Sequence, residues 1–584
     1  MKLTAIDWAI VALYFLLNLG IGLYYRARAG KSVGEYFLSG RNVPWWLAGT
    51  SMVATTFAAD TPLAVTGMVA RNGIAGNWLW WTFVASGMLT VFFYARLWRR
   101  AGVTTDIEFS EIRYGGRPAA FLRGFRALYL GIPINCIILG WVNLAMVKIL
   151  ELIFGVTKPE ALVLVVALIV VTSLISTLSG LWGVLWTDLV QFVIKMGMVI
   201  VLAVVAVRAV GGMSAMRTQL TASGRGSVLN FLPDLHSAWM PLITFLVYIS
   251  LNWWATWYPG AEPGGGGYVA QRMLSAKDEK NSLLATLWFN IAHYAIRPWP
   301  WILVALASLI LYPGLADPET GYIRVMIDHL PPSLRGLMVA AFAAAYMSTI
   351  ATQLNWGASY VVNDFYRRFI RRGADERHYV VASRWATVLL TLISVAVTFR
   401  MDSIAGAWKL LIVTGAGTGA VLLLRWYWWR INAWSELAAM ISAFVVSVLL
   451  QTAGGLNSDQ PVDFAWIMII TVAITTLVWL AVTFLTRPES PETLVAFYRR
   501  TRPSLAGWRP VAAQAPEVKP AGGGLHDLVD WIAGCVLIYG VLFGVGKLLL
   551  QETVLGLLLL GLGLSAGGVI YRDLTRRGWA VVVD

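Results

Sequence analysis

The sequence predicts an all-α integral membrane protein, and three observations support that fold class. Of its 584 residues, 58% are apolar and only 13% are charged, whereas a soluble domain carries about 25% charged residues. Apolar runs long enough to cross a bilayer recur along the whole chain. Two of these runs are interrupted by Gly and Pro, which is typical of secondary transporters that bind their cargo where a helix is broken.

The apolar runs define the candidate helices in order. They lie near 4–25, 45–70, 75–98, 120–153, 160–178, 183–208, 237–257, 283–312, 332–366, 379–399, 404–429, 433–452, 463–485, 527–550 and 553–571, which makes fifteen. The first run is followed rather than preceded by most of its nearby positive charge, so we expect a retained helix and not a cleaved signal peptide. Segment 486–526, rich in Pro and Arg, is expected to be a cytoplasmic linker before a final helix pair.

The distribution of Lys and Arg predicts the orientation of the chain. With the N-terminus outside, 31 of the 45 Lys and Arg residues fall in inner loops and ten on the outer side. Because inner loops of membrane proteins are enriched in Lys and Arg, we expect an external N-terminus and a cytoplasmic C-terminus in the plasma (inner) membrane. The net charge of +14 therefore reflects topology and does not indicate binding to nucleic acid.

Several function classes are disfavoured by what the sequence lacks. It contains no Walker-type phosphate loop, which argues against ATP-driven pumping. It shows no nucleophile–base pair or metal-ligand cluster, and its five histidines are scattered, so we expect a transporter and not an enzyme. Cys136 and Cys535 lie in apolar segments without metal-type spacing and are interpreted as core residues.

The two interrupted runs are the first candidate functional elements. One is the Ala/Thr-rich segment 49–62, which contains Asp60 and ends at Pro62, and the other is 253–267, which contains Pro259 and four successive glycines. Five helices separate their starting points, as expected for two inverted repeats. Unwound backbone offers carbonyls to a cation and amide ends to an anion. An ordinary cytoplasmic loop is the alternative for 259–267.

The run 339–355 carries an unusual set of polar side chains for a membrane helix. Ser348 and Thr349 are adjacent, and Thr352 and Gln353 follow one turn later. A hard cation is bound by oxygens, so these hydroxyls are candidate ligands. The alternative is that they bond back to carbonyls of their own helix.

Ionisable residues at membrane depth are candidate functional residues by default. Arg297 lies at the centre of its helix, four residues after His293, so the two share a face. Arg297 is expected either to pair with Asp60 or to contact a substrate carboxylate. The aromatic cluster of Trp253, Trp254, Trp257 and Tyr258 suits stacking on a sugar ring instead, which leaves two substrate classes open.

A third polar face lies on the helix 183–208. Asp188, Gln191 and Lys195 follow one another at i, i+3 and i+7. Asp188 could receive a cation leaving its site. Lys195 is expected either to neutralise a buried acid or to place its ammonium where a cation would otherwise bind.

These residues resemble the solute:sodium symporter family, which includes the sodium/proline, sodium/glucose and sodium/pantothenate carriers. The resemblance rests on six short motifs in the same order and topology. They are Tyr36-Phe-Leu-Ser-Gly-Arg41 with Gly49-Thr-Ser51, Thr105-Asp-Ile-Glu-Phe109, Gly183-Val-Leu-Trp-Thr-Asp188 with Gln191, Gln271-Arg272-Met-Leu-Ser-Ala-Lys277, Met347-Ser-Thr349 and Asn363-Asp-Phe-Tyr366.

The resemblance implies a LeuT-like fold of two inverted five-helix repeats with one extra helix before them and about four after them. The expected divisions are 1–41 (first helix and inner loop), 42–235 (first repeat), 236–432 (second repeat), 433–485 (two extra helices), 486–526 (linker) and 527–584 (final helix pair and tail). It also implies a sodium site made of the carbonyls of Ala54, Phe57 and Ala345 and the hydroxyls of Ser348 and Thr349.

Further roles are implied by the same resemblance. Asp188 corresponds to an acid on the intracellular sodium route, and with Thr352 it could hold a second cation. Thr56 occupies a position that faces the solute in relatives, and Pro259 with Lys195 is expected to act in gating or coupling. A lysine near the cation site is also found in proton-coupled transporters of this fold, so proton coupling stays open.

The sequence therefore predicts sodium-coupled uptake of a small polar organic solute by a chain that works as a monomer, with a carboxylate-bearing solute favoured. A sugar-type solute and proton coupling are the alternatives, and a membrane-embedded sensor is a remote one because no kinase domain is present. The coupling mechanism requires that oxygens of the helix unwound near Ala54 and of the helix bearing Ser348 converge on a cation in the gap between them, and segments lying far apart would contradict it. A Lys195 nitrogen lodged there would contradict it.

Overall fold

The computed structural model describes residues 3–29, 38–103, 105–520 and 523–579. Within these ranges the regular structure is entirely helical, apart from two isolated bridges between single residues. Among the described residues, eleven helices are long and apolar enough to cross a membrane, or twelve when one bent pair counts as a span. Tyr36 and Phe37 of the first motif lie outside the described residues.

The main helices follow the predicted runs closely. They are α1 (Ala5–Ala29), α3 (Trp45–Thr56), α4 (Asp60–Asn72), α7 (Ala95–Ala101), α8 (Phe109–Arg113), α9 (Gly116–Tyr129), α10 (Asn135–Phe154), α11 (Lys158–Ala209), α13 (Leu242–Val247), α14 (Trp253–Ala255), α15 (Gly267–Ser275), α16 (Glu279–Asn290), α17 (Pro298–Leu311), α19 (Leu334–Ser359), α20 (Glu376–Phe399), α21 (Ile404–Thr414), α22 (Gly419–Tyr427), α23 (Ala433–Thr452), α24 (Pro461–Leu485), α25 (Pro491–Thr501), α26 (Arg509–Ala512), α27 (Gly524–Leu549) and α28 (Thr553–Arg577).

The first predicted break is present between α3 and α4, whose axes are bent by 59°. The helix stops at Thr56 and restarts at Asp60. Pro62 lies in the first turn of α4, where its missing N–H is tolerated because that amide has no intrahelical partner. The break exposes the last carbonyls of α3 to side chains of neighbouring helices.

The second predicted break is also present, and it pairs with a third break that the sequence analysis missed. Residues 256–266 separate α14 from α15, and residues 415–418 separate α21 from α22. The two broken segments are joined by hydrogen bonds from Trp257 N to Gly415 O (3.3 Å) and from Gly417 N to Ala255 O (2.7 Å). A Cβ at Gly419 would lie 1.8 Å from the carbonyl oxygen of Trp254. This close approach explains the glycines at 415 and 419, whereas Gly417 has a φ of +90° and a Cβ there would lie 2.7 Å from Thr475 Cβ.

One other expectation about the chain needs correction. The predicted runs 160–178 and 183–208 are not separate helices, because α11 is helical throughout from Lys158 to Ala209. Segment 486–526, predicted to be a cytoplasmic linker, contains the short helices α25 and α26. The Trp508 ring stacks on Phe497 at 5.4 Å, and its Nε1 donates to the Trp426 carbonyl at 2.9 Å. These contacts attach the segment to the end of α22.

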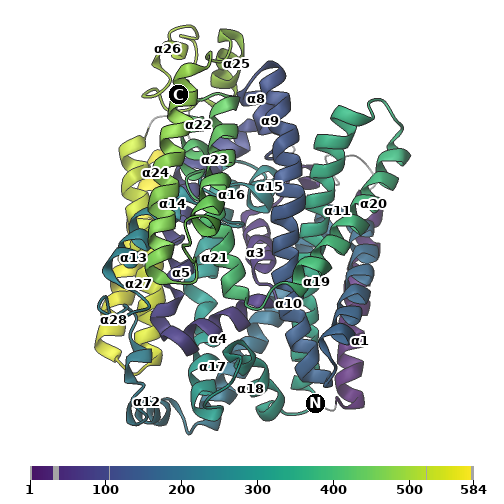
Figure 1. The fold of residues 1–584 in the computed structure, drawn as a ribbon, viewed down its shortest axis with the longest axis vertical. Helices are drawn as coiled ribbons and strands as arrows, with labels where there is room; N and C mark the ends of the chain where they lie inside the picture. The colour runs from purple at the N-terminus through teal and green to yellow at the C-terminus, as the bar shows by residue number, and fades with distance from the viewer. Residues whose placement is uncertain (1–2, 30–37, 104, 521–522, 580–584) are drawn as a thin grey trace.

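The N- and C-terminal ends of the chain lie at opposite ends of the molecule (Figure 1). Helix α1 packs against α11 and α19, and Asp7 Oδ1 accepts hydrogen bonds from the Ser333 and Gly336 amides at the start of α19. At the other end of the sequence, α27 and α28 pack closely together. Helix α1 is thus positioned to hold the two helices that carry the candidate coupling residues.

Candidate cation and solute site

The broken end of α3 faces the middle of α19, as the sequence analysis expected. Thr349 Oγ1 lies 3.2 Å from the carbonyl oxygen of Thr55 and 3.1 Å from that of Ala345. The second contact is the bond to its own helix that was the alternative interpretation, and the first reaches across to α3. The hydroxyl therefore joins α3 and α19 in the buried interior of the bundle.

The gap between these helices contains the Lys195 ammonium. Lys195 Nζ donates to the carbonyls of Ala54 (3.1 Å) and Phe57 (3.2 Å), and it lies 5.5 Å from the centre of the Phe57 ring. The side chain is 1% exposed. The expectation of an open gap is therefore wrong, because a long side chain from α11 reaches the carbonyls that the resemblance assigns to sodium.

Ser348 does not point to the Lys195 ammonium. Its hydroxyl donates to Asp188 Oδ1 at 2.8 Å, and the hydroxyl of Ser51 donates to Asp188 Oδ2 at 2.6 Å. Arg272 lies next to this carboxylate, with Nη2 at 3.9 Å from Asp188 Oδ2 and Nε at 3.3 Å from Ser51 Oγ. One buried carboxylate thus connects α3, α11, α15 and α19.

The second-cation hypothesis involves Asp188 and Thr352. Within the described ranges, the hydrogen-bond partners of Asp188 are Ser51 and Ser348, and Thr352 is not among them. Thr352 is half-buried one turn farther along α19. The structure brings Asp188 to the hydroxyls of two helices, but it does not bring Thr352 into that cluster.

Arg297, His293 and Thr56 form a second polar cluster at the end of α3, in which Arg297 is buried and the other two are half-buried. Arg297 Nη2 lies 2.6 Å from His293 Nδ1, and Arg297 Nη1 lies 3.2 Å from Thr56 Oγ1. Because a guanidinium only donates, His293 Nδ1 must accept, which makes this histidine neutral. The guanidinium also lies over the rings of Phe57 (5.7 Å) and Trp301 (5.1 Å).

The proposed structural pair between Arg297 and Asp60 is not formed. No ion pair within 4.0 Å joins Arg297 to any acid of the described ranges. Arg297 is 1% exposed and its Nε has no hydrogen-bond partner. Asp60 is 3% exposed, lies in the first turn of α4, and its Oδ1 also lacks a partner. Two buried groups of opposite charge thus retain unused hydrogen-bonding capacity.

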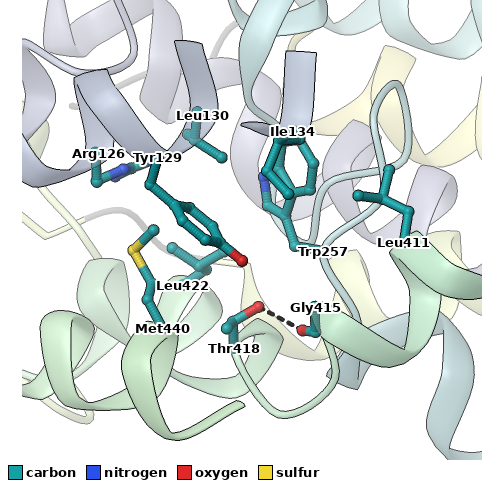
Figure 2. A pocket seen from close by; sticks show the side chains of 10 residues that line it. All are labelled: Arg126, Tyr129, Leu130, Ile134, Trp257, Leu411, Gly415, Thr418, Leu422 and Met440. Carbon is teal, nitrogen blue, oxygen red and sulfur yellow. Dashed lines mark hydrogen bonds between the residues drawn. The ribbon is translucent and has the colours of Figure 1, made fainter. Parts of the chain in front are cut away.

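The aromatic residues before Pro259 do not form one stacking surface. Trp253 packs against Trp531 of α27 at 5.6 Å, and Tyr258 stacks on Phe83 at 5.2 Å. Figure 2 shows Trp257 on one side of a mostly apolar cavity, opposite Tyr129. Its lining residues are Arg126, Tyr129, Leu130, Ile134, Trp257, Leu411, Gly415, Thr418, Leu422 and Met440.

This cavity borders the second and third breaks. Its lining residues do not include Arg297, His293 or Thr56. Thr418 Oγ1 donates to the Gly415 carbonyl at 2.8 Å across the third break, the bond drawn in Figure 2. Of the residues predicted to bind the solute, Trp257 alone is among those that line it. Pro259 is half-buried within the second break, close to its start.

Two residues of the site were missed as functional candidates. Ser51 and Arg272 were recognised only as parts of family motifs, and Arg272 was counted among the charges of an inner loop. The structure places Arg272 in α15, 1% exposed, against Asp188. Its position in the last turn of a short helix that begins at the last of four glycines was the available signal.

Comparison with known proteins shows which family the chain resembles over most of its length. A sequence profile described as the sodium:solute symporter family matches residues 36–443. A sodium/glucose cotransporter of Vibrio parahaemolyticus is 24% identical over 477 residues, covering 77% of this chain and 86% of its own length. Sodium/glucose cotransporter 4 of Danio rerio is 26% identical over 596 residues, covering 90% and 85%.

A solved structure supports the fold independently. The structure of a Na⁺-coupled sialic acid symporter in a substrate-bound outward-open state superposes with a TM-score of 0.65 at 20% sequence identity, covering 84% of this chain and 99% of that chain. The all-helical LeuT-like fold class expected from the sequence is thereby confirmed. The family profile covers both broken helices, α11 and α19. The chain therefore belongs to the sodium:solute symporter family, whose members are sodium-coupled solute transporters and not enzymes.

Proposed function

We propose that this chain takes up a small polar organic solute across the plasma membrane by coupling it to sodium entry. The observation that carries this proposal is the contact between the broken end of α3 and the middle of α19, where Thr349 Oγ1 lies 3.2 Å from the carbonyl oxygen of Thr55. The C-terminal end of a helix favours positive charge because its last carbonyls are unpaired. The family supplies sodium as the transported cation for such a position.

In this proposal the sodium ligands are the carbonyls of Ala54, Phe57 and Ala345 and the hydroxyls of Ser348 and Thr349. Support comes from the contact between Thr349 and the Thr55 carbonyl, which holds α19 against the residues next to Ala54. For sodium to bind, Lys195 has to leave Ala54 and Phe57. A cation that bridges the two helices would favour the conformation that accepts solute, and solute would in turn tighten cation binding.

The proposed solute carries a carboxylate, which Arg297 binds. Burial of a guanidinium without an acid partner is costly, and a carboxylate could use the free Arg297 Nε that the protein leaves unpaired. The neutral His293 and the Thr56 hydroxyl position the guanidinium against Phe57. Asp60 lies on the other half of the broken helix, where it suits an amino or hydroxyl group of the same solute.

A sugar-type solute is the second candidate for the substrate. It is supported by relatives named as glucose cotransporters, which match 77% and 90% of this chain. Asp60 and His293 would then hydrogen-bond sugar hydroxyls. The separation of Trp253, Trp257 and Tyr258 onto different surfaces weakens the stacking argument that first favoured this class.

Proton coupling is the second candidate for the driving ion, and the Lys195 contacts favour it specifically. An ammonium that already fills the cation position could itself be the coupled charge. Proton and sodium coupling are separated by uptake into proteoliposomes, after a thermal-shift screen of carboxylates, amino acids and sugars has identified a solute. An inward sodium gradient at equal pH should drive accumulation, and an inward proton gradient without sodium should not. Accumulation under the proton gradient alone would overturn sodium coupling.

A further inference from the structure

We propose that Lys195 is a tethered competitor of sodium, and that the displaced ammonium is received by Gln191 and Asp188 on the same helix face. This inference rests on the proposed function for the identity of the ion, and it adds a device that sets how tightly the ion binds. It follows from three observations: what Lys195 contacts, what Gln191 leaves unpaired, and how the face of α11 is arranged.

The first observation is that the Lys195 ammonium contacts neutral backbone carbonyls and an aromatic ring. A buried lysine is normally paired with an acid instead. Its contacts are the Ala54 and Phe57 carbonyls and the Phe57 ring, and no acid of the described chain lies within 4.0 Å of its Nζ. Sodium and the ammonium require the same two oxygens. Because like charges a few ångströms apart repel strongly in a buried site, one cation excludes the other.

The second observation is an unused acceptor one turn away. Gln191 is 5% exposed, and its Nε2 donates to Tyr14 Oη (2.8 Å) and Asn18 Oδ1 (3.1 Å) of α1. These two bonds fix the amide, while Gln191 Oε1 is buried without a hydrogen-bond partner. A buried amide oxygen left unpaired carries a free-energy cost, so an approaching ammonium would satisfy it.

The third observation is the register of this face. Gln191 precedes Lys195 by four residues and Asp188 precedes it by seven, so all three lie on one side of α11. Helical side chains lean toward the N-terminus of their helix, which directs Lys195 toward Gln191. Beyond Gln191 lies the Asp188 carboxylate with Ser51, Ser348 and Arg272. The ammonium can therefore move between a carbonyl site and an amide–carboxylate site without leaving the protein interior.

The test measures sodium affinity of the purified full chain by tryptophan fluorescence or thermal shift, with sodium chloride titrated against N-methylglucamine chloride at constant ionic strength. Lys195→Met removes the competitor and should lower the apparent sodium Kd by about tenfold or more, within the usual range of coupling between sites. Gln191→Leu removes the receiving oxygen and should raise that Kd. Lys409→Met, at a half-buried lysine on α21, is the matched control and should leave it unchanged.

The outcomes separate this inference from the proposed function. An unchanged or raised sodium Kd in Lys195→Met would overturn the competition, and an unchanged Kd in Gln191→Leu would overturn the receiving site. If the wild-type chain does not bind sodium but Lys195→Met does, competition stands and sodium coupling of the wild type falls. If Lys195→Met does not fold, Gln191→Leu decides, since a raised Kd supports the inference and an unchanged one rejects it.

Discussion

Two buried lysines of this protein are held in different ways. Lys148 of α10 is bound by two acids, Glu319 at 2.6 Å and Asp317 at 2.7 Å. Lys195 of α11 is bound by two backbone carbonyls and faces an aromatic ring. If an ammonium that neutralises a buried carboxylate moves away, the carboxylate stays buried without a counter-charge, which is costly. An ammonium held by dipoles can be exchanged for another cation, so the first lysine is suited to structure and the second to coupling.

The largest expected effect is on stability, when the ion-paired lysine, Lys148, is replaced. Lys148→Met leaves Glu319, which is fully buried, without its cation, and we expect a loss of stability of about 3–5 kcal/mol. Lys195→Met leaves only carbonyls unpaired and should cost about 1–2 kcal/mol. Thermal unfolding of both variants in the same detergent measures the difference. Equal losses would mean that Lys195 also neutralises a buried acid.

The next largest effect is expected on solute binding, at the buried guanidinium of Arg297. Arg297→Lys keeps the charge but loses the planar fork, so solute binding should weaken by about 1.5–3 kcal/mol, roughly ten- to a hundredfold. Solute affinity at saturating sodium is the measurement. Unchanged affinity would assign Arg297 a structural role with His293 and Thr56.

A smaller effect is expected at the hydroxyls of α19. Ser348→Ala or Thr349→Ala should raise the sodium concentration required for half-maximal uptake by about tenfold, which corresponds to about 1.4 kcal/mol for one ligand. The protein should still insert and remain folded. Sodium titration of uptake in proteoliposomes measures this shift, and an unchanged requirement in both variants would refute the proposed ligand set.

The smallest expected effect is a loss of stability when a hydrogen bond to Glu319, the partner of Lys148, is removed. Ser403 Oγ donates to Glu319 Oε1 at 3.2 Å, so Ser403→Ala should reduce stability by about 1 kcal/mol. Because this contact belongs to the ion-paired lysine, sodium affinity should stay at the wild-type value. A change in sodium affinity would show that the Lys148 and Lys195 regions are coupled.

The sequence was informative where chemistry at membrane depth is unusual. Asp188, Lys195, Arg297 and Ser348 stand out because polar groups in apolar helices need partners, and the structure places each of them in a buried polar cluster. The first two breaks were predictable because Pro and repeated Gly interrupt long apolar runs. These features are local, so one sequence is enough to show them.

The contacts of long side chains and the pairing of distant backbone segments could not be predicted from the sequence. A lysine extends several ångströms from its backbone, so Lys195 could have reached Asp188, Asp60 or the α3 carbonyls, and only packing selects among them. The third break depends on the antiparallel pairing of residues 256 and 416, which joins segments far apart in the chain. The inner loops predicted from the charge count include Arg113, Arg126, Arg272 and Arg425, and all four side chains are buried.

The most direct test of the central claim is an experimental structure of the full chain in saturating sodium. The account predicts an ion between the carbonyls of Ala54 and Phe57, with the Lys195 ammonium moved toward Gln191. A Lys195 nitrogen that still contacts both carbonyls, in a preparation shown to take up solute with sodium, would contradict a shared position for the two cations.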